Sequence, residues 1–139
     1  MSLSSLLNRR VATVNPKDSL AKVGGLMELE NVGAIVVTEG DRPVGIVTDR
    51  DLALAVCVRG ASPQEHVQSV MTCPVSTISK DEGIYNATQQ MMEHAVRRLP
   101  VVDPSGGLVG LVSLDDLLLL LSRELQNMAE GIKVETAVG

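Results

Sequence analysis

The chain has 139 residues, of which 45% are hydrophobic and 21% charged, as in an ordinary folded domain rather than a disordered segment. Its net charge of −5 argues against duplex nucleic acid as the main partner, and one tyrosine without tryptophan or phenylalanine offers no stacking platform for single strands. The length fits one compact domain or two very small ones.

The first half of the chain alternates apolar segments of strand length with segments of helical spacing. A helix is expected to begin at Asp18 or Ser19, since both residue types cap helices. The predicted elements, in order, are an extended segment at 11–14, a helix carrying Leu20, Val23, Leu26 and Met27, strands at 34–37 and 44–47, and a helix that begins near Asp49.

The second half has the same elements in the same order, after a linker with Gly, Ser and Pro at residues 59–63. Its first helix is expected to begin near Ser79 or Asp81. The predicted elements are an extended segment at 75–78, a helix carrying Ile84, Ala87 and Met91, strands at 99–102 and 108–112, and a helix that begins near Leu114.

The two halves are copies of one unit, because the chain matches itself at a nearly constant offset. An offset of 64 pairs Val11 with Val75, and after one inserted residue an offset of 65 pairs Gly45 with Gly110. The insertion falls in a turn, where a repeat tolerates it. We therefore expect a first repeat at 5–60, a linker at 61–68, a second repeat at 69–125, and a helix end with a tail at 126–139.

Each copy has the order strand, helix, strand, strand, helix, which predicts an α/β (α+β) fold with a mixed sheet covered by helices. A unit of roughly 55 to 60 residues is marginally stable alone. We expect the two β-α-β-β-α repeats to be pseudo-symmetric, to pack sheet to sheet around a shared core, and to leave a cleft between them.

The most informative polar residues lie in two related segments, residues 45–51 and 110–116. Each segment has a glycine, two apolar residues, a hydroxyl residue and, three residues later, an aspartate. This is the spacing of a helix capping box. The same helix start can also hold a ligand, since an acid there accepts hydrogen bonds from a ribose diol. Both interpretations stay open for Thr48 with Asp51 and for Ser113 with Asp116.

Arg97 and Arg98 come directly before a buried strand, where the first copy has Gly33 and Ala34. Adjacent arginines are often only solvated charges. The difference between the copies favours, as an alternative, one basic patch that binds a phosphate and two uncharged residues that leave room for a flat ring.

No catalytic or metal-binding residue is predicted. Cys57 and Cys73 lack the C-x-x-C spacing, have no histidine at a motif spacing, and make no metal-ligand pattern with His66 and His94. The longest leucine run is far shorter than the about 20 apolar residues of a membrane span, and the first seven residues do not resemble a signal peptide. A cytoplasmic protein without a membrane partner is expected.

The last helix is apolar on more than one side, which indicates burial on more than one side. We therefore predict a homodimer that forms through the leucine-rich helix around Leu117 to Leu121. Leu119 and Leu120 lie outside its apolar stripe, which consists of Leu117, Leu118, Leu121, Leu125 and Met128.

The duplicated pattern resembles a tandem pair of cystathionine-β-synthase (CBS) domains, the Bateman module. The resemblance covers about residues 5 to 122. It is carried by four segments that match the family in order, at residues 45–52 (GIVTDRDL), 71–78 (MTCPVSTI), 96–103 (VRRLPVVD) and 110–117 (GLVSLDDL).

The resemblance implies regulation by an adenosyl ligand, namely AMP, ADP, ATP, NAD or S-adenosylmethionine, with no required cofactor. It implies one site with Ser113 and Asp116 near the ribose and Val11, Val14, Gly33 and Ala34 around the base, and another with Thr48, Asp51, Val75, Ile78 and Val96. It further implies that Arg97 and Arg98 bind phosphates between the clefts. Because Gly33 and Ala34 bring no cation, two equally strong phosphate sites are not expected.

Two functions follow from these residues. The first is a nucleotide sensor that changes its shape or dimer packing and passes the change to a regulated protein. The second is a ligand-free dimerisation or protein-interaction module, in which the paired hydroxyl and acidic residues serve only as helix caps. An enzyme is disfavoured, because no nucleophile with a base and no metal site supports it.

Overall fold

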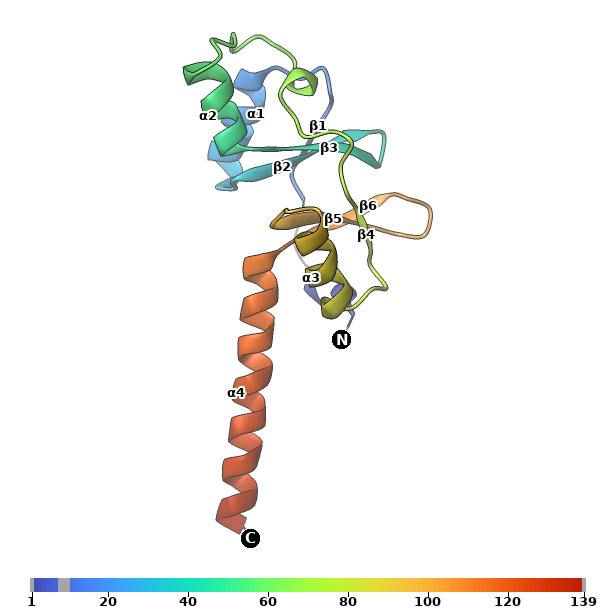
Figure 1. Cartoon of the computed structure of the whole chain (residues 1–139), viewed down its shortest axis with the longest axis vertical. Coiled ribbons are helices and arrows are strands. Elements are labelled where there is room, and N and C mark those ends of the chain that lie inside the picture. The colour runs from blue at the N-terminus through green and yellow to red at the C-terminus, as the bar shows by residue number, and fades with distance from the viewer. Residues whose placement is uncertain (1, 8–10, 139) are drawn as a thin grey trace.

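Two copies of one α/β unit are stacked in the computed structural model of the chain, which describes residues 2–7 and 11–138 (Figure 1). The first copy consists of η1 (Leu3–Leu6), β1 (Thr13–Val14), α1 (Leu20–Glu30), β2 (Ala34–Glu39), β3 (Arg42–Thr48) and α2 (Asp49–Cys57). The second consists of η2 (Val67–Ser69), β4 (Ile78–Ser79), α3 (Ile84–Glu93), β5 (Arg98–Val102), β6 (Leu108–Ser113) and α4 (Leu114–Val138). The predicted fold class, two pseudo-symmetric α/β repeats, is confirmed.

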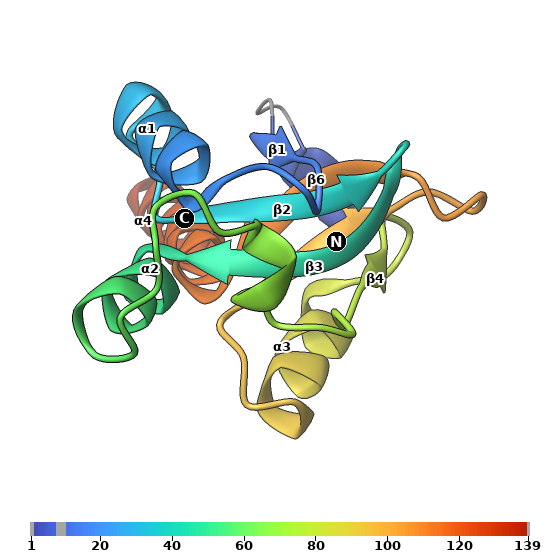
Figure 2. The same cartoon turned by 90° about the horizontal axis from the view of Figure 1, so that it is seen from above.

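Each copy has one three-stranded mixed sheet, in the order β1-β2-β3 or β4-β5-β6. The opening strand is parallel to the middle strand, and the middle strand is antiparallel to the last. The registers correspond between copies, since Val14 pairs with Val37 and Ile78 pairs with Val101. The two sheets face each other, with α1 and α2 beyond one and α3 beyond the other (Figure 1). Seen from above, β2 and β3 run side by side across the fold (Figure 2).

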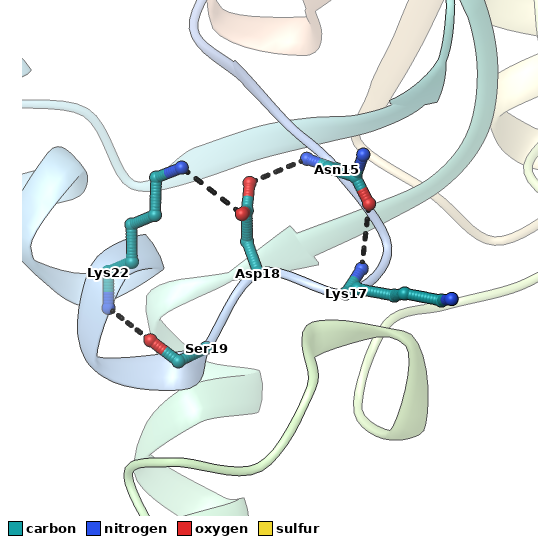
Figure 3. A network of polar contacts seen from close by, with 5 residues as sticks. All are labelled: Asn15, Lys17, Asp18, Ser19 and Lys22. Carbon is teal, nitrogen blue, oxygen red and sulfur yellow. Dashed lines mark hydrogen bonds and ion pairs between the residues drawn. The ribbon is translucent and has the colours of Figure 1, made fainter.

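The start of α1 is fixed by a small polar network (Figure 3). The Ser19 side chain accepts a hydrogen bond from the Lys22 backbone N–H at 3.1 Å, so Ser19 is the predicted cap. The Asp18 carboxylate accepts from the Asn15 N–H at 2.8 Å and from Lys22 Nζ at 3.1 Å. These contacts, chiefly the one from Asn15, lower the pKa of the Asp18 carboxyl because they stabilise its charged form.

The opening strands are shorter than predicted. β1 covers only the second half of the expected segment 11–14, so the strand begins later than predicted and ends where predicted. The chain turns directly after it at Asn15, whose side chain accepts a hydrogen bond from the Lys17 N–H at 2.9 Å. β4 begins at the last residue of the expected segment 75–78. The helix after it, α3, has Gly83 at its N-cap rather than the predicted Ser79 or Asp81, since Ser79 belongs to β4.

The buried apolar residues form one cluster in each repeat, so the expectation of one shared core is wrong. In the first repeat, Ile35 and Val37 of β2 are clustered with residues of α1. Because alternate strand residues point to opposite faces, Val36 of β2 lies on the other face, and it is fully buried as well. Each sheet is therefore covered by helices on one face and by the other repeat on the opposite face.

Each core is completed by a residue from the segment that leads into the other repeat. Leu3 is fully buried in the second-repeat cluster, and its N–H donates to the Glu82 carbonyl at 2.9 Å. Val67, within the predicted linker 61–68, is fully buried in the first-repeat cluster and donates to the Asp18 carbonyl at 2.8 Å. This exchange of leader segments joins the two repeats.

The last helix, α4, has 25 residues and extends far from the body of the fold (Figure 1). Its Leu117 is only 1% exposed and belongs to the second-repeat core, so the predicted apolar stripe does not include it. Leu118, by contrast, is 57% exposed. None of the helices in the described part of the chain is long and apolar enough to cross a membrane.

Candidate functional site

A cavity of about 400 Å³ lies between the two repeats, and this volume suits a small-molecule ligand. It joins the beginning of the first repeat to the end of the second, which are far apart in the sequence. The lining residues are Leu6, Leu7, Val11, Ala12, Val32, Gly33, Ala34, Arg98, Gly110, Leu111, Ser113, Asp116, Leu119, Leu120 and Arg123.

The polar side of the cavity begins where β6 passes into α4. The Ser113 hydroxyl accepts from the Asp116 N–H at 3.1 Å, and Asp116 Oδ2 accepts from the Ser113 N–H at 3.1 Å. This is a complete capping box, so the structural role of both residues is real. Asp116 Oδ1 has no hydrogen-bond partner among the described residues, and Asp116 lines the cavity. The cap and a ligand can therefore share one carboxylate.

The opposite side of the cavity is apolar and belongs to the first repeat. Of the four residues expected around a base, Val11, Gly33 and Ala34 line the cavity. Val14 does not line it, because its side chain is only 5% exposed and packs in the first-repeat core. None of the lining residues is aromatic, so a flat ring here would contact aliphatic side chains and backbone.

The two adjacent arginines have different surroundings. Arg98, the first residue of β5, lines the cavity and is half-buried. Arg97 does not line it, and its guanidinium lies 3.4 Å from an Asp115 carboxylate oxygen, with both side chains exposed. Of the predicted phosphate-binding pair, only Arg98 is at the cavity.

Three of the nine lining residues that sequence reasoning missed come from α4. Leu119, Leu120 and Arg123 line the cavity together with Asp116. The signal was present in the sequence, because positions three, four and seven residues after Asp116 lie on the same face of a helix. With Arg98 and Arg123 against Asp116, the cavity has an excess of one positive charge, although the chain as a whole is acidic.

The second predicted set does not line this cavity. Thr48 and Asp51 form the same capping box at α2, with hydrogen bonds of 2.9 and 3.2 Å. Ile78 is buried in the second-repeat core, whereas Val75 and Val96 are half-buried. The structure therefore brings most of one predicted ligand set together at the cavity, and no member of the other set lines it.

No group of three His, Cys, Asp or Glu side chains that could hold a metal ion occurs within the described residues. Cys57 and Cys73 are both exposed and unpaired. The chemistry that the cavity offers is that of binding: an acceptor at Asp116, cations at Arg98 and Arg123, and an apolar wall.

The family model of the CBS domain matches the chain twice, at residues 3–57 and 67–123. Among curated proteins, the CBS domain-containing protein YhcV of Bacillus subtilis is 38% identical over 116 residues, which are 84% of this chain and 82% of YhcV. The uncharacterized protein MK0525 of Methanopyrus kandleri is 34% identical over 120 residues, or 85% of this chain. The chain spans only 61% of the length of that second relative.

A solved structure has the same architecture over most of both chains. The CBS domain protein PAE2072 from Pyrobaculum aerophilum, in complex with AMP, matches with a TM-score of 0.78 at 26% identity. The match covers 88% of this chain and 99% of that one.

Proposed function

The chain belongs to the CBS domain family, and on this premise we propose that it is a regulatory module that binds an adenosyl ligand between its two repeats. The matched residues form a CBS domain pair, which is a regulatory module and not an enzyme. Binding changes the shape or the dimer packing of the module, and a regulated protein responds to that change.

The cavity of about 400 Å³ is the observation that carries this proposal. Asp116 Oδ1 accepts hydrogen bonds from the ribose hydroxyls, and the Ser113 hydroxyl lies beside it. The adenine ring lies against the apolar wall, where Gly33 and Ala34 leave room for it. Arg98 and Arg123 bind the phosphate, because guanidinium groups make paired hydrogen bonds to phosphate oxygens.

AMP is the first ligand to test, since the CBS domain protein from Pyrobaculum aerophilum was solved with AMP. ADP, ATP, NAD and S-adenosylmethionine share the adenosyl group and are the other candidates. Two arginines and one aspartate favour a ligand with at least one phosphate over an uncharged nucleoside. The ligand regulates the protein and is not a cofactor.

A second, weaker site is proposed at the pseudo-equivalent position. It would combine the helix start at Thr48 and Asp51 with Val75, Ile78 and Val96, with Arg97 at its edge. The ion pair between Arg97 and Asp115 competes with a phosphate there, which supports unequal sites. The proposed stoichiometry is one tight site in each chain.

The alternative is a ligand-free dimerisation or interaction module. Both capping boxes favour it, because they explain the paired hydroxyl and acidic residues without a ligand. In both versions we propose a homodimer that uses the leucine-rich part of α4. A reducing, cytoplasmic compartment fits the two exposed, unpaired cysteines.

A dye-based thermal shift with the five adenosyl ligands tests the proposal. A ligand at 100 times its dissociation constant stabilises the fold by about 2.7 kcal/mol, which raises the melting temperature by several degrees. A selective shift with AMP or another member supports the sensor. No shift with any of the five ligands supports the ligand-free module.

A further inference from the structure

The tips of the two β-hairpins are joined to each other across the interface between the repeats. The Leu108 backbone N–H donates to the Asp41 carbonyl at 2.8 Å, and a guanidinium nitrogen of Arg42 donates to the Ser105 carbonyl at 2.9 Å. Each bond links the hairpin of β2 and β3 to the hairpin of β5 and β6. We name these four residues the hairpin contact.

The internal repeat explains why the hairpin contact uses an arginine side chain. Its two carbonyl groups are equivalent, since Asp41 and Ser105 are 64 residues apart. The residue equivalent to Leu108 is Pro43, 65 residues earlier, and proline has no backbone N–H to donate. Arg42 supplies a donor from its side chain instead. One of the two bonds between the hairpins therefore depends on a single side chain.

The second hairpin leaves room for that side chain. Gly106 has a φ of +90°, which other residues rarely adopt, and a Cβ atom there would lie only 2.7 Å from Arg42 Nη1. A cavity of about 280 Å³ lies beside this place, between Asp41 of one hairpin and Leu108 of the other. Because the cavity interrupts the packing between the hairpins, the two hydrogen bonds hold the tips together.

The hairpin contact and the ligand cavity lie at opposite ends of the same strands. β6 begins at Leu108 and ends at Ser113, which lines the cavity. β2 begins at Ala34, which also lines the cavity, and ends at Glu39, beside the turn. Six residues of strand span about 20 Å. Both turns project away from α1, α2 and the start of α4 (Figure 1 and Figure 2).

Among the described residues, the hydrogen bonds that position the walls of the ligand cavity each stay within one repeat. The Asp49 N–H donates to the Gly33 carbonyl at 3.0 Å in the first repeat, and the Leu114 N–H donates to the Arg97 carbonyl at 2.8 Å in the second. The separation of the walls therefore depends on the tilt between the two sheets. A tilt of about 5° over a strand of about 20 Å moves a wall by about 2 Å, which is enough to break a hydrogen bond to a ligand.

We propose that the hairpin contact fixes the tilt between the two repeats, and that Arg42 is a positioning residue of the ligand cavity, although it does not line it. This inference rests on the proposed ligand site and adds to it a residue at the far end of the strands. Loss of Arg42 lowers the fraction of the protein whose cavity walls are correctly spaced. Because this fraction multiplies the affinity of any ligand of the cavity, AMP and adenosine are weakened by the same factor.

Titration calorimetry with AMP and adenosine tests the role of Arg42. Arg42→Met keeps the apolar part of the side chain and removes its donors, and it is expected to weaken both ligands equally, by about 3- to 10-fold. Arg59→Met removes the same charge from an exposed residue outside the hairpins and the cavity, and it is expected to leave both affinities unchanged. Unchanged affinities in Arg42→Met, or a loss for AMP alone, would overturn the proposal.

A distance measurement by electron paramagnetic resonance tests the tilt without a ligand. Spin labels on Leu29→Cys of α1 and Met92→Cys of α3, in a chain whose two native cysteines are serines, report on the cavity end of the two repeats. Both side chains are exposed, at 80% and 71%, and both lie near the end of their helix. Excess unlabelled chain confines the measurement to distances within one chain. Arg42→Met is expected to broaden the distance distribution and Arg59→Met to leave it narrow.

The ligand-free measurement separates a failure of this proposal from a failure of the proposed function. If the wild type binds none of the five adenosyl ligands while Arg42→Met broadens the distribution, the proposed function fails and the hairpin contact is supported. If the wild type binds AMP while Arg42→Met leaves the distribution as narrow as Arg59→Met does, the ligand site stands and the role of Arg42 is overturned.

Discussion

Leu7 packs directly on the backbone of Gly110, so closely that a Cβ atom at this glycine would overlap the leucine side chain. Met71 packs on Gly45 in the same way. The two contacts are related by the internal repeat, since Leu7 and Met71 are 64 residues apart and the glycines 65. Each leader segment therefore crosses the last strand of the other repeat, and the crossing requires a glycine.

The first prediction concerns this crossing at the cavity, which Leu7 and Gly110 both line. Gly110→Ala is expected to lower the free energy of unfolding by about 1–3 kcal/mol, because the added methyl group overpacks the contact. It is also expected to weaken AMP binding. Urea denaturation and calorimetry measure the two effects.

Gly25→Ala is the matched control for Gly110→Ala. Gly25 lies within α1, and nothing lies within 4 Å of a Cβ atom built there. Alanine is expected to stabilise this exposed helix position by about 0.5–1 kcal/mol. If Gly110→Ala were as stable as Gly25→Ala, the close crossing would be refuted.

The second prediction separates the two adjacent arginines. Arg98→Gln removes a cation from the cavity and is expected to weaken AMP binding by about tenfold, equivalent to about 1.4 kcal/mol, while adenosine binding changes little. The reason is that only AMP carries a phosphate. Titration calorimetry with AMP and adenosine gives both affinities.

Arg97→Gln is the control for the second prediction, since Arg97 pairs with Asp115 at the surface and does not line the cavity. It is expected to leave the tight AMP site unchanged. An equal loss of AMP affinity in the two variants would mean that the arginines act only through the overall positive charge of the surface.

The third prediction concerns the pH dependence of stability. The folded-state pKa of Asp18 is lowered, so its charged form contributes stability above its unfolded pKa of about 3.9, and this contribution is lost as pH falls through the folded pKa. Asp18→Asn is therefore expected to destabilise the fold at neutral pH and to make little difference in strong acid. Urea denaturation at both pH values measures the difference in the free energy of unfolding between the wild type and Asp18→Asn. A difference of the same size at both pH values would contradict a stabilising role of the charged Asp18 carboxylate.

Much of the fold was predictable because the repeat gave each element twice. The middle and last strands of each copy pair as expected, since their apolar residues leave little choice of face. The beginnings of the opening strands were predicted too early, because β1 and β4 each pair with the middle strand over only two residues. The burial of Val67 could not be predicted, because a single valine in a polar linker does not form the periodic apolar pattern that indicates a buried face. The repeat boundaries 5–60 and 69–125 stay a prediction.

The site was predictable only in part. Ser113 and Asp116 stand out from the sequence because a capping box has a fixed spacing. Arg97 and Arg98 could not be told apart, since which of two neighbours turns toward a cavity depends on the exact start of β5. Arg123 lies seven residues after Asp116 and so on the same face of the helix, but its place at the cavity follows only from the structure, in which α4 forms one wall of the cavity.

The most direct test of the central claim compares two matched variants, Asp116→Asn and Asp51→Asn. Both remove one charge from a capping box that an asparagine oxygen can still complete, so both proteins are expected to remain folded. Only Asp116 lines the cavity. We expect Asp116→Asn to weaken the tight binding of AMP by about 10- to 100-fold, because a charged acceptor for the ribose is lost, and Asp51→Asn to leave it unchanged. Equal AMP affinities of the two variants in titration calorimetry would contradict a ligand site at Asp116 and favour the ligand-free module.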